Sequence, residues 1–235
     1  DGFDIHTTIN LNIQDVAENA LLRQLQLHDA DHGCVILMEV ETGEIKAIAN
    51  LSKDDDGDYW EYYNYAIGES TEPGSTFKLP SLITALEDGY ITLTDSVETG
   101  NGRAEFHGEI MRDSKEDGYG KISIKEAFAV SSNIGVMRVI ERYYANEPEK
   151  FIKGLKRMKL GDKIGIEISG EGEPLIKDPS DNSWSLITPL WTSIGYEVQA
   201  TPLQILTFYN AIANDGKMIK PKFVRKITDK SSVVR

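Results

Sequence analysis

Cysteine is nearly absent from this sequence, and no long hydrophobic run is present. Cys34 is the single cysteine among 235 residues, so no disulfide can form within the chain. It lies in the apolar run 34–38, where a thiol usually behaves as a small buried hydrophobe rather than as a nucleophile. No stretch reaches the ~20 apolar residues that a membrane-spanning helix needs, and the first residues show no signal-peptide pattern.

Several functional patterns are also missing. There is no Gly-x-Ser-x-Gly turn of an α/β-hydrolase and no glycine-rich phosphate loop. The four histidines stand in loop-like or terminal contexts, and no spacing of His, Cys or Glu is typical of a zinc site. The net charge of −13 argues against the basic footprint that nucleic acid requires. We therefore expect no metal, no cofactor and no nucleic-acid partner.

The hydrophobic pattern predicts an α+β protein. Residues 11–27 have helical periodicity behind Asn10, a suitable N-cap. Two apolar runs, 34–40 and 45–51, predict a β-hairpin whose first strand is buried on both faces. Further helices are predicted at 75–88, 123–130, 134–145, 148–159 and 202–214. Loops and short strands are expected over 161–200 and a strand over 218–227, an order that does not alternate as βαβ units do.

The sharpest local motif is Glu72-Pro73-Gly74-Ser75-Thr76-Phe77-Lys78. Glu-Pro-Gly predicts a turn, so Ser75 is expected at a helix N-terminus, where free N–H groups and the helix dipole stabilise anions. Lys78 follows at i+3, so its amine can fold back onto the Ser75 hydroxyl. A serine needs such a base to become a nucleophile, and burial can lower the pKa of a lysine enough to serve. Taken alone, the motif is explained better by an N-cap serine with a surface lysine, because Ser-x-x-Lys often occurs by chance.

A second motif, Val130-Ser131-Ser132-Asn133-Ile134-Gly135, lies between two predicted helices. Ser131 and Asn133 are two residues apart, which allows both side chains to point into a cleft. A hydroxyl can relay a proton to a leaving amine, and a carboxamide can orient a substrate amide through its donor and acceptor. Capping of the following helix is the alternative explanation.

Together these residues resemble the penicillin-binding transpeptidases, and more narrowly class B of the cell-division (septal) type. Other segments of the chain extend the likeness in order: 7–14, 33–51, Asn64-Tyr65-Ala66, Gly165 to Glu171, and Ser193 to Val198 followed by Thr201-Pro202-Leu203-Gln204. The resemblance implies an α+β fold like that of these enzymes and of serine β-lactamases, with an antiparallel sheet and helices. It implies one partial transpeptidase domain over 1–235: an N-terminal part 5–51, a mostly helical part 52–216 and the start of a C-terminal sheet 217–235.

The resemblance also implies roles for the motif residues. Ser75 would attack the D-Ala-D-Ala amide of a peptidoglycan stem peptide, with Lys78 as base, Ser131 as proton shuttle and Asn133 as the residue that positions substrate. β-Lactam antibiotics would acylate Ser75. The implied location is the periplasmic or extracytoplasmic face of the cell membrane, with an N-terminal anchor outside this chain and cell-division membrane proteins as partners.

One family motif, Lys-Thr/Ser-Gly, is absent, and Lys230-Ser231-Ser232 does not replace it. We therefore expect the fold to be incomplete at the C-terminus and this chain alone to be nearly inactive, since losing one oxyanion donor typically costs ~10²–10³ in rate. An unpaired edge on the 34–51 hairpin would favour a dimer or a strand swap. Two other functions stay open: a non-catalytic penicillin sensor or scaffold, and a serine β-lactamase, although no acid is placed by motif as its deacylating base.

Overall fold

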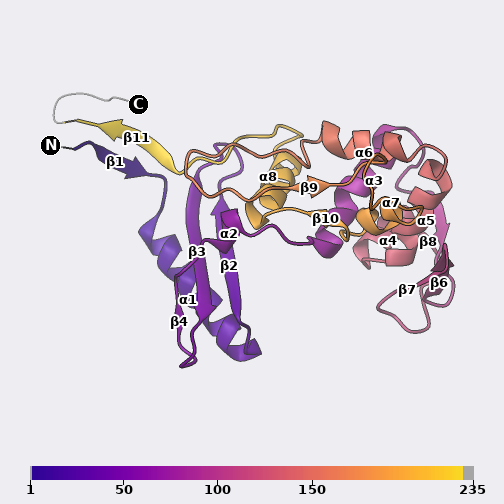
Figure 1. The fold of residues 1–235 in the computed structure, drawn as a ribbon, viewed down its shortest axis with the longest axis horizontal. Helices are drawn as coiled ribbons and strands as arrows, with labels where there is room; N and C mark the ends of the chain where they lie inside the picture. Colours follow the sequence, from indigo (N-terminus) through magenta and orange to yellow (C-terminus); the bar gives the residue numbers. More distant parts are fainter. Residues whose placement is uncertain (1, 230–235) are drawn as a thin grey trace. The chain divides into compact units, whose positions relative to one another are not determined.

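A computed structural model gives the fold of the chain and describes residues 2–229 (Figure 1). Lys230-Ser231-Ser232 lies outside the described residues. The chain divides into two compact units: unit 1 comprises Asp1–Ser70, Lys163–Glu173 and Thr201–Arg235, and unit 2 comprises Thr71–Asp162 and Pro174–Ala200. Among the described residues, no helix is both long and apolar enough to span a membrane.

Unit 1 combines antiparallel strands with helices. Its strands are β1 (Asp4–Thr7), β2 (His32–Met38), β3 (Ile45–Lys53), β4 (Tyr59–Trp60) and β11 (Val224–Thr228). Its helices are α1 (Leu11–His28), α2 (Tyr65–Gly68) and α8 (Pro202–Ala213). Strands β2, β3 and β4 form one sheet in that order, and β1 pairs with β11. The strand expected over 218–227 begins later than predicted, at Val224.

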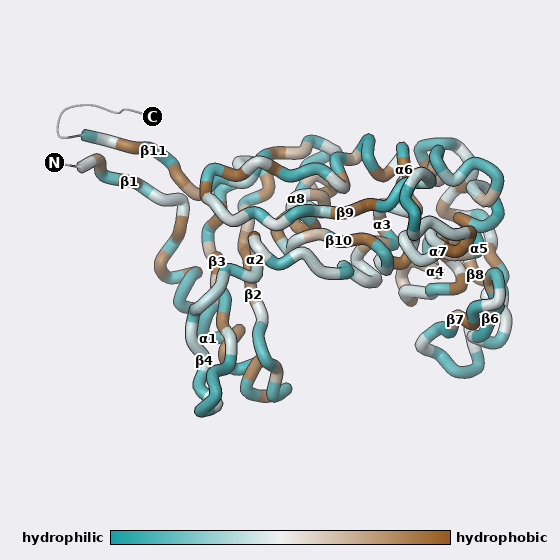
Figure 2. The backbone as a smooth tube through the Cα atoms, in the orientation of Figure 1, coloured by the Kyte–Doolittle hydropathy of each residue, from teal (hydrophilic) through white to brown (hydrophobic). Residues whose placement is uncertain are grey.

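Helix α1 begins where the sequence predicts because Asn10 caps it. The Asn10 side-chain oxygen accepts a hydrogen bond from the Ile13 N–H at 3.3 Å, and the helix ends at Asp29, whose backbone is left-handed (φ 51°). The buried face of α1 packs against β3 through Leu21 and Leu25. Figure 2 shows that hydrophobic and hydrophilic residues alternate along α1, as expected for a helix with one buried face.

The predicted hairpin is confirmed, but the burial of its first strand is not as predicted. Strands β2 and β3 pair antiparallel. Strand β3 carries the buried side chains, whereas β2 is half-buried and Leu37 is 44% exposed. The prediction was wrong because β3, not β2, is the central strand and is the main contact of α1. Among the described residues β2 pairs only with β3, so the dimer or strand swap stays a prediction.

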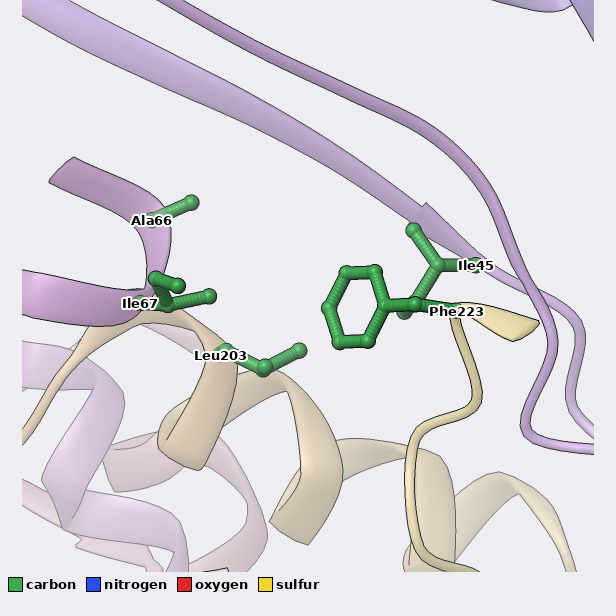
Figure 3. Packing of buried hydrophobic residues seen from close by; sticks show 5 residues of the cluster. All are labelled: Ile45, Ala66, Ile67, Leu203 and Phe223. Atoms are coloured by element: carbon green, nitrogen blue, oxygen red, sulfur yellow. The ribbon is translucent and has the colours of Figure 1, made fainter. Parts of the chain in front are cut away.

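The core of unit 1 joins its strands to α2 and α8 (Figure 3). The cluster consists of Ile45, Ala66, Ile67, Leu203 and Phe223. The Phe223 ring points toward the side chains of the two helices. Nearby, the buried Thr8 hydroxyl donates to the Ile45 carbonyl oxygen at 2.7 Å, so the segment after β1 is tied to the start of β3.

Unit 2 is mostly helical, with short antiparallel strand pairs. Its helices are α3 (Lys78–Glu87), α4 (Ile124–Ala129), α5 (Asn133–Tyr144), α6 (Pro148–Arg157) and α7 (Thr188–Ser193). Its strands are β5 (Ser96–Glu98), β6 (Arg103–Phe106), β7 (Glu109–Arg112), β8 (Lys121–Ser123), β9 (Leu175–Ile176) and β10 (Val198–Gln199). The strands pair as β5 with β8, β6 with β7 and β9 with β10. The predicted α+β class is confirmed, as are the helices.

Helix α7 lies within the segment 161–200, which the sequence predicted to be loops and short strands on the surface. Its residues are instead among the most buried: Leu190 is 2% exposed, and Thr192 and Ser193 are fully buried. The prediction failed because the helix has only six residues, too few for a visible period. Its polar residues also favoured a prediction of surface exposure. In the structure, the Ser193 hydroxyl donates to the Leu190 carbonyl oxygen within the helix, so it can be buried.

A buried carboxylate joins three helices of unit 2. Asp88, after the end of α3, accepts hydrogen bonds from the Tyr144 hydroxyl of α5 at 2.8 Å and from Arg157 of α6 at 3.1 Å. Burial raises the pKa of the Asp88 carboxyl, but these hydrogen bonds and the positive charges of Lys150 and Arg157 together outweigh it and leave the pKa lowered. Asp88 is therefore held ionised by its partners.

We expect Tyr144→Phe to lower the free energy of unfolding by about 1–2 kcal/mol, because the buried Asp88 carboxylate loses a donor. Urea denaturation of the whole protein measures this. Tyr143→Phe is the matched control: Tyr143 stacks on Tyr90, and its hydroxyl makes no hydrogen bond within the described residues. Equal stability losses in the two variants would contradict the prediction.

Candidate active site

The turn before Ser75 is held by close backbone packing. Gly74 has φ +55° and opens a 3₁₀ turn (Gly74–Phe77) that leads directly into α3. The Gly74 N–H donates to the Gly195 carbonyl oxygen at 3.1 Å. A Cβ on Gly195 would lie 2.0 Å from the Gly74 oxygen, so only glycine allows this approach. Ser75 follows this turn and is exposed.

The segment after Gly195 also pairs with the segment before Gly74. Thr71 and Ala200 exchange two backbone hydrogen bonds, at 3.2 and 3.0 Å. The Glu72 carboxylate accepts from the Glu197 N–H at 2.9 Å, and the Glu197 carboxylate pairs with Lys177 at 3.0 Å. This ladder fixes the entry to the Ser75 turn at several points, which is the rigidity that a nucleophile's position requires.

Lys78 is a buried lysine that contacts Ser131. It is 1% exposed, and its amine donates to the Ser131 carbonyl oxygen at 2.6 Å and to the Ser131 hydroxyl oxygen at 2.8 Å. Burial lowers the pKa of Lys78 to about 8, and the negative charge of Asp113 opposes that shift. A lysine in this state can accept a proton near neutral pH, unlike a lysine in water.

The 131–133 turn joins α4 to α5. Ser131 has a left-handed backbone (φ 56°), which is uncommon for a residue with a side chain and marks a position fixed by its surroundings. The helix cap is Ser132, whose hydroxyl accepts from the Gly135 N–H at 2.8 Å. Capping therefore occupies Ser132 and leaves the Ser131 hydroxyl to Lys78.

Asn133 is the first residue of α5, and its side-chain amide donates to the Arg112 carbonyl oxygen at 3.1 Å. It also lines a cavity of about 550 Å³ within unit 2. The other lining residues are Ile110, Met111, Arg112, Trp191, Tyr196 and Glu197. Asn133 thus stands at the wall of a space that can admit a ligand.

The structure brings Lys78 and Ser131 into direct contact and places Asn133 two residues along the same turn. It does not join Ser75 to Lys78 by a hydrogen bond: within the described residues, the amine's hydrogen bonds go to Ser131. The Ser75–Lys78 contact stays a prediction. Such contacts often form only when substrate is bound.

Sequence reasoning missed Asp113, a buried carboxylate next to the 131–133 turn. Asp113 accepts hydrogen bonds from the Ser132 hydroxyl at 2.8 Å and from the Ile134 N–H at 3.1 Å. It is 8% exposed. No motif surrounds it in the sequence, and only the fold brings it to a turn about twenty residues later. Among the described residues, no group of three or more His, Cys, Asp or Glu side chains is arranged to hold a metal ion.

A nucleophile-type serine at a helix start and a buried lysine bound to a second serine define a serine acyl-transfer type of site. Comparison with known proteins agrees. The family model described as the penicillin binding protein transpeptidase domain matches residues 33–234, and the chain belongs to this family. The resemblance to class B penicillin-binding proteins is therefore confirmed.

Individual relatives cover nearly all of the chain. It is 28% identical to stage V sporulation protein D of Bacillus subtilis over 97% of this chain and 36% of that protein. It is 26% identical to the probable peptidoglycan D,D-transpeptidase PenA of Neisseria meningitidis over 96% of this chain and 38% of that protein. The chain thus spans somewhat over a third of the length of these relatives.

A solved structure confirms the fold. The crystal structure of penicillin binding protein 3 from Mycobacterium tuberculosis, complexed with ampicillin, superposes with a TM-score of 0.85. The match has 24% sequence identity and covers 99% of this chain and 52% of that chain. The fold predicted from the resemblance, that of the penicillin-binding transpeptidases, is correct.

Proposed function

We propose that the whole protein is a peptidoglycan D,D-transpeptidase that crosslinks D-Ala-D-Ala stem peptides through an acyl-enzyme on Ser75. The observation that carries this proposal is the buried Lys78 amine in contact with Ser131. A fully buried lysine without a carboxylate partner is costly to a fold, and a catalytic base is a use that repays it. Family membership and a relative named as a probable D,D-transpeptidase support the same activity.

In the proposed acylation, the Ser75 oxygen attacks the carbonyl carbon of the penultimate D-Ala, and its proton passes to the Lys78 amine. The Ser75 N–H, at the start of the 3₁₀ turn, stabilises the developing oxyanion. Ser131 then relays the proton to the leaving amine of the terminal D-Ala, whose bond to the carbonyl carbon breaks. The amine of a second stem peptide then attacks the ester carbonyl carbon. The bond from this carbon to the Ser75 oxygen breaks, a proton of the amine returns to that oxygen, and the crosslinking amide forms.

Asn133 is proposed to orient the stem-peptide backbone. Its side-chain nitrogen already donates to the Arg112 carbonyl oxygen, so its carboxamide oxygen is directed by that bond and can accept from a substrate N–H. Its place on the wall of the cavity supports this role. No observation of this kind supports the two alternative functions, a non-catalytic penicillin sensor or scaffold and a serine β-lactamase.

We also propose β-lactams as inhibitors and an extracytoplasmic location, as the family implies. A structural relative of this chain has been solved with ampicillin, and a β-lactam presents a strained amide to the same nucleophile. The proposed partners are cell-division membrane proteins, with anchoring by an N-terminal segment.

Acylation by a fluorescent penicillin tests the proposal in the whole protein. The native protein is expected to be labelled at the peptide that contains Ser75, and Ser75→Ala is expected to lose all labelling. Ser96→Ala, an exposed serine of β5 in the same unit, serves as the control and should label as the native protein does. Mass spectrometry of the labelled peptide identifies the residue. Equal labelling of Ser75→Ala and native protein would refute the proposal.

A further inference from the structure

Asp113 is a buried titratable group that the proposed mechanism does not use. It follows β7 and is 8% exposed, yet no lysine or arginine pairs with it within the described residues. A buried carboxylate without an ion-pair partner is costly unless hydrogen bonds compensate. Its retention next to the candidate site therefore calls for a function.

Both side-chain hydrogen bonds of Asp113 support one short segment. One carboxylate oxygen accepts from the Ser132 hydroxyl at 2.8 Å, and the other accepts from the Ile134 N–H at 3.1 Å. Ser132 is fully buried and stands between the two candidate residues Ser131 and Asn133. A carboxylate bonded at two points, one on each side of position 133, leaves this turn little freedom to rotate.

The negative charge of Asp113 also acts on the Lys78 amine. Lys78 donates a hydrogen bond to Ser131. The next residue, Ser132, donates one to Asp113. The negative charge of Asp113 raises the pKa of Lys78 against the larger effect of burial. Among the described residues, Asp113 is the charged group that clearly shifts the pKa of the Lys78 amine. The Ser131 hydroxyl and carbonyl groups that the amine contacts are neutral.

We propose that Asp113 is a positioning residue of the acyl-transfer site, which locks the Ser131–Asn133 turn through Ser132 and supplies negative charge to the surroundings of Lys78. This inference rests on the proposed function. Asp113 does not touch the reacting atoms. It acts through Ser132 on the proton relay and through its charge on the base.

The two effects of Asp113 can be separated by substitution. Asp113→Asn keeps the shape of the side chain but removes the charge and weakens the bond to the Ile134 N–H. Ser132→Ala removes the hydrogen bond to Asp113 and the cap on the Gly135 N–H, and keeps the charge of Asp113. We expect both variants to lose acylation at the high-pH plateau by about tenfold, the cost of one charge-assisted hydrogen bond.

The pH profile distinguishes positioning from a merely structural role. In the whole protein, the rate of penicillin acylation is measured from pH 5.5 to 9.5 for native, Asp113→Asn and Ser132→Ala. The acid limb of Asp113→Asn is expected to move to lower pH, because Lys78 loses a charge that favours its protonated form. The acid limb of Ser132→Ala is expected to stay where it is in the native protein.

Each outcome decides between specific ideas. If native protein is not acylated at Ser75, the proposed function fails. If native protein is acylated and Asp113→Asn keeps both its plateau and its acid limb, the Asp113 inference fails alone. Should Asp113→Asn not fold, a native plateau in Ser132→Ala still overturns the positioning role, and a tenfold loss supports it.

Discussion

Replacing Gly195 with alanine is expected to reduce acylation of Ser75 by about a hundredfold or more. A Cβ at this position would lie 2.0 Å from the Gly74 oxygen and 2.5 Å from its carbonyl carbon. These are backbone atoms, so no side-chain rotation can relieve the clash. Gly74 must move, and Ser75 is the next residue. A displacement of about 1 Å at a reacting group can cost 10²-fold in rate.

Gly89→Ala is the matched control for this experiment. Gly195 and Gly89 both have positive φ, +89° and +71°, so alanine strains the backbone at either site. A Cβ on Gly89 meets open space, however. Both variants should lose stability in urea denaturation, but only Gly195→Ala should lose penicillin acylation in the whole protein. Native acylation by a folded Gly195→Ala protein would show that the contact does not fix the nucleophile.

Elements with local signals were predictable from the sequence. Helix α1 has a capping asparagine and a long period, and α8 begins with Thr201 as N-cap and Pro202 in its first turn. The hairpin was predictable from its two apolar runs. These features act within a few residues, so they can be identified before the fold is known.

Features that depend on contacts between distant residues were not predictable. The half-exposure of β2 follows from the sheet order, which places β3 in the centre. The burial of α7 follows from packing against α5, not from its own composition. Asp113 meets Ser132 only because β7 and the turn before α5 converge. Periodicity carries no information on such pairings.

The candidate site, too, was predictable from the sequence only in part. The residue types of the two motifs predicted Ser75, Lys78, Ser131 and Asn133 as candidates. The motifs could not show that Ser132 would take the capping role. They also could not show that the buried amine of Lys78 would bond to Ser131 rather than to Ser75. Burial of a lysine is a property of the whole unit.

Lys78 should make acylation depend on pH with an apparent pKa of about 8. Burial lowers the pKa of its amine from 10.5 to about 8, so at pH 7 about a tenth of the amines are neutral rather than fewer than about one in a thousand. The rate of penicillin acylation should rise with pH through this range and then level. Lys78→Arg stays charged and cannot accept the proton, so it should lose about 10³-fold or more. A flat profile between pH 6 and 9 in the native protein would contradict this role.

The same burial implies that Lys78→Met stabilises the protein while it abolishes acylation. Between the folded pKa of about 8 and the ordinary value of 10.5, the unfolded chain binds more protons than the folded one, so this lysine makes stability rise with pH. Below pH 8 its full cost is present, and Lys78→Met removes it at the expense of two hydrogen bonds to Ser131. We expect a gain of about 1–3 kcal/mol in urea denaturation at pH 7 that disappears by about pH 10.5. A loss of stability at pH 7 would mean that Lys78 holds the fold together, and its burial would then no longer indicate selection for catalysis.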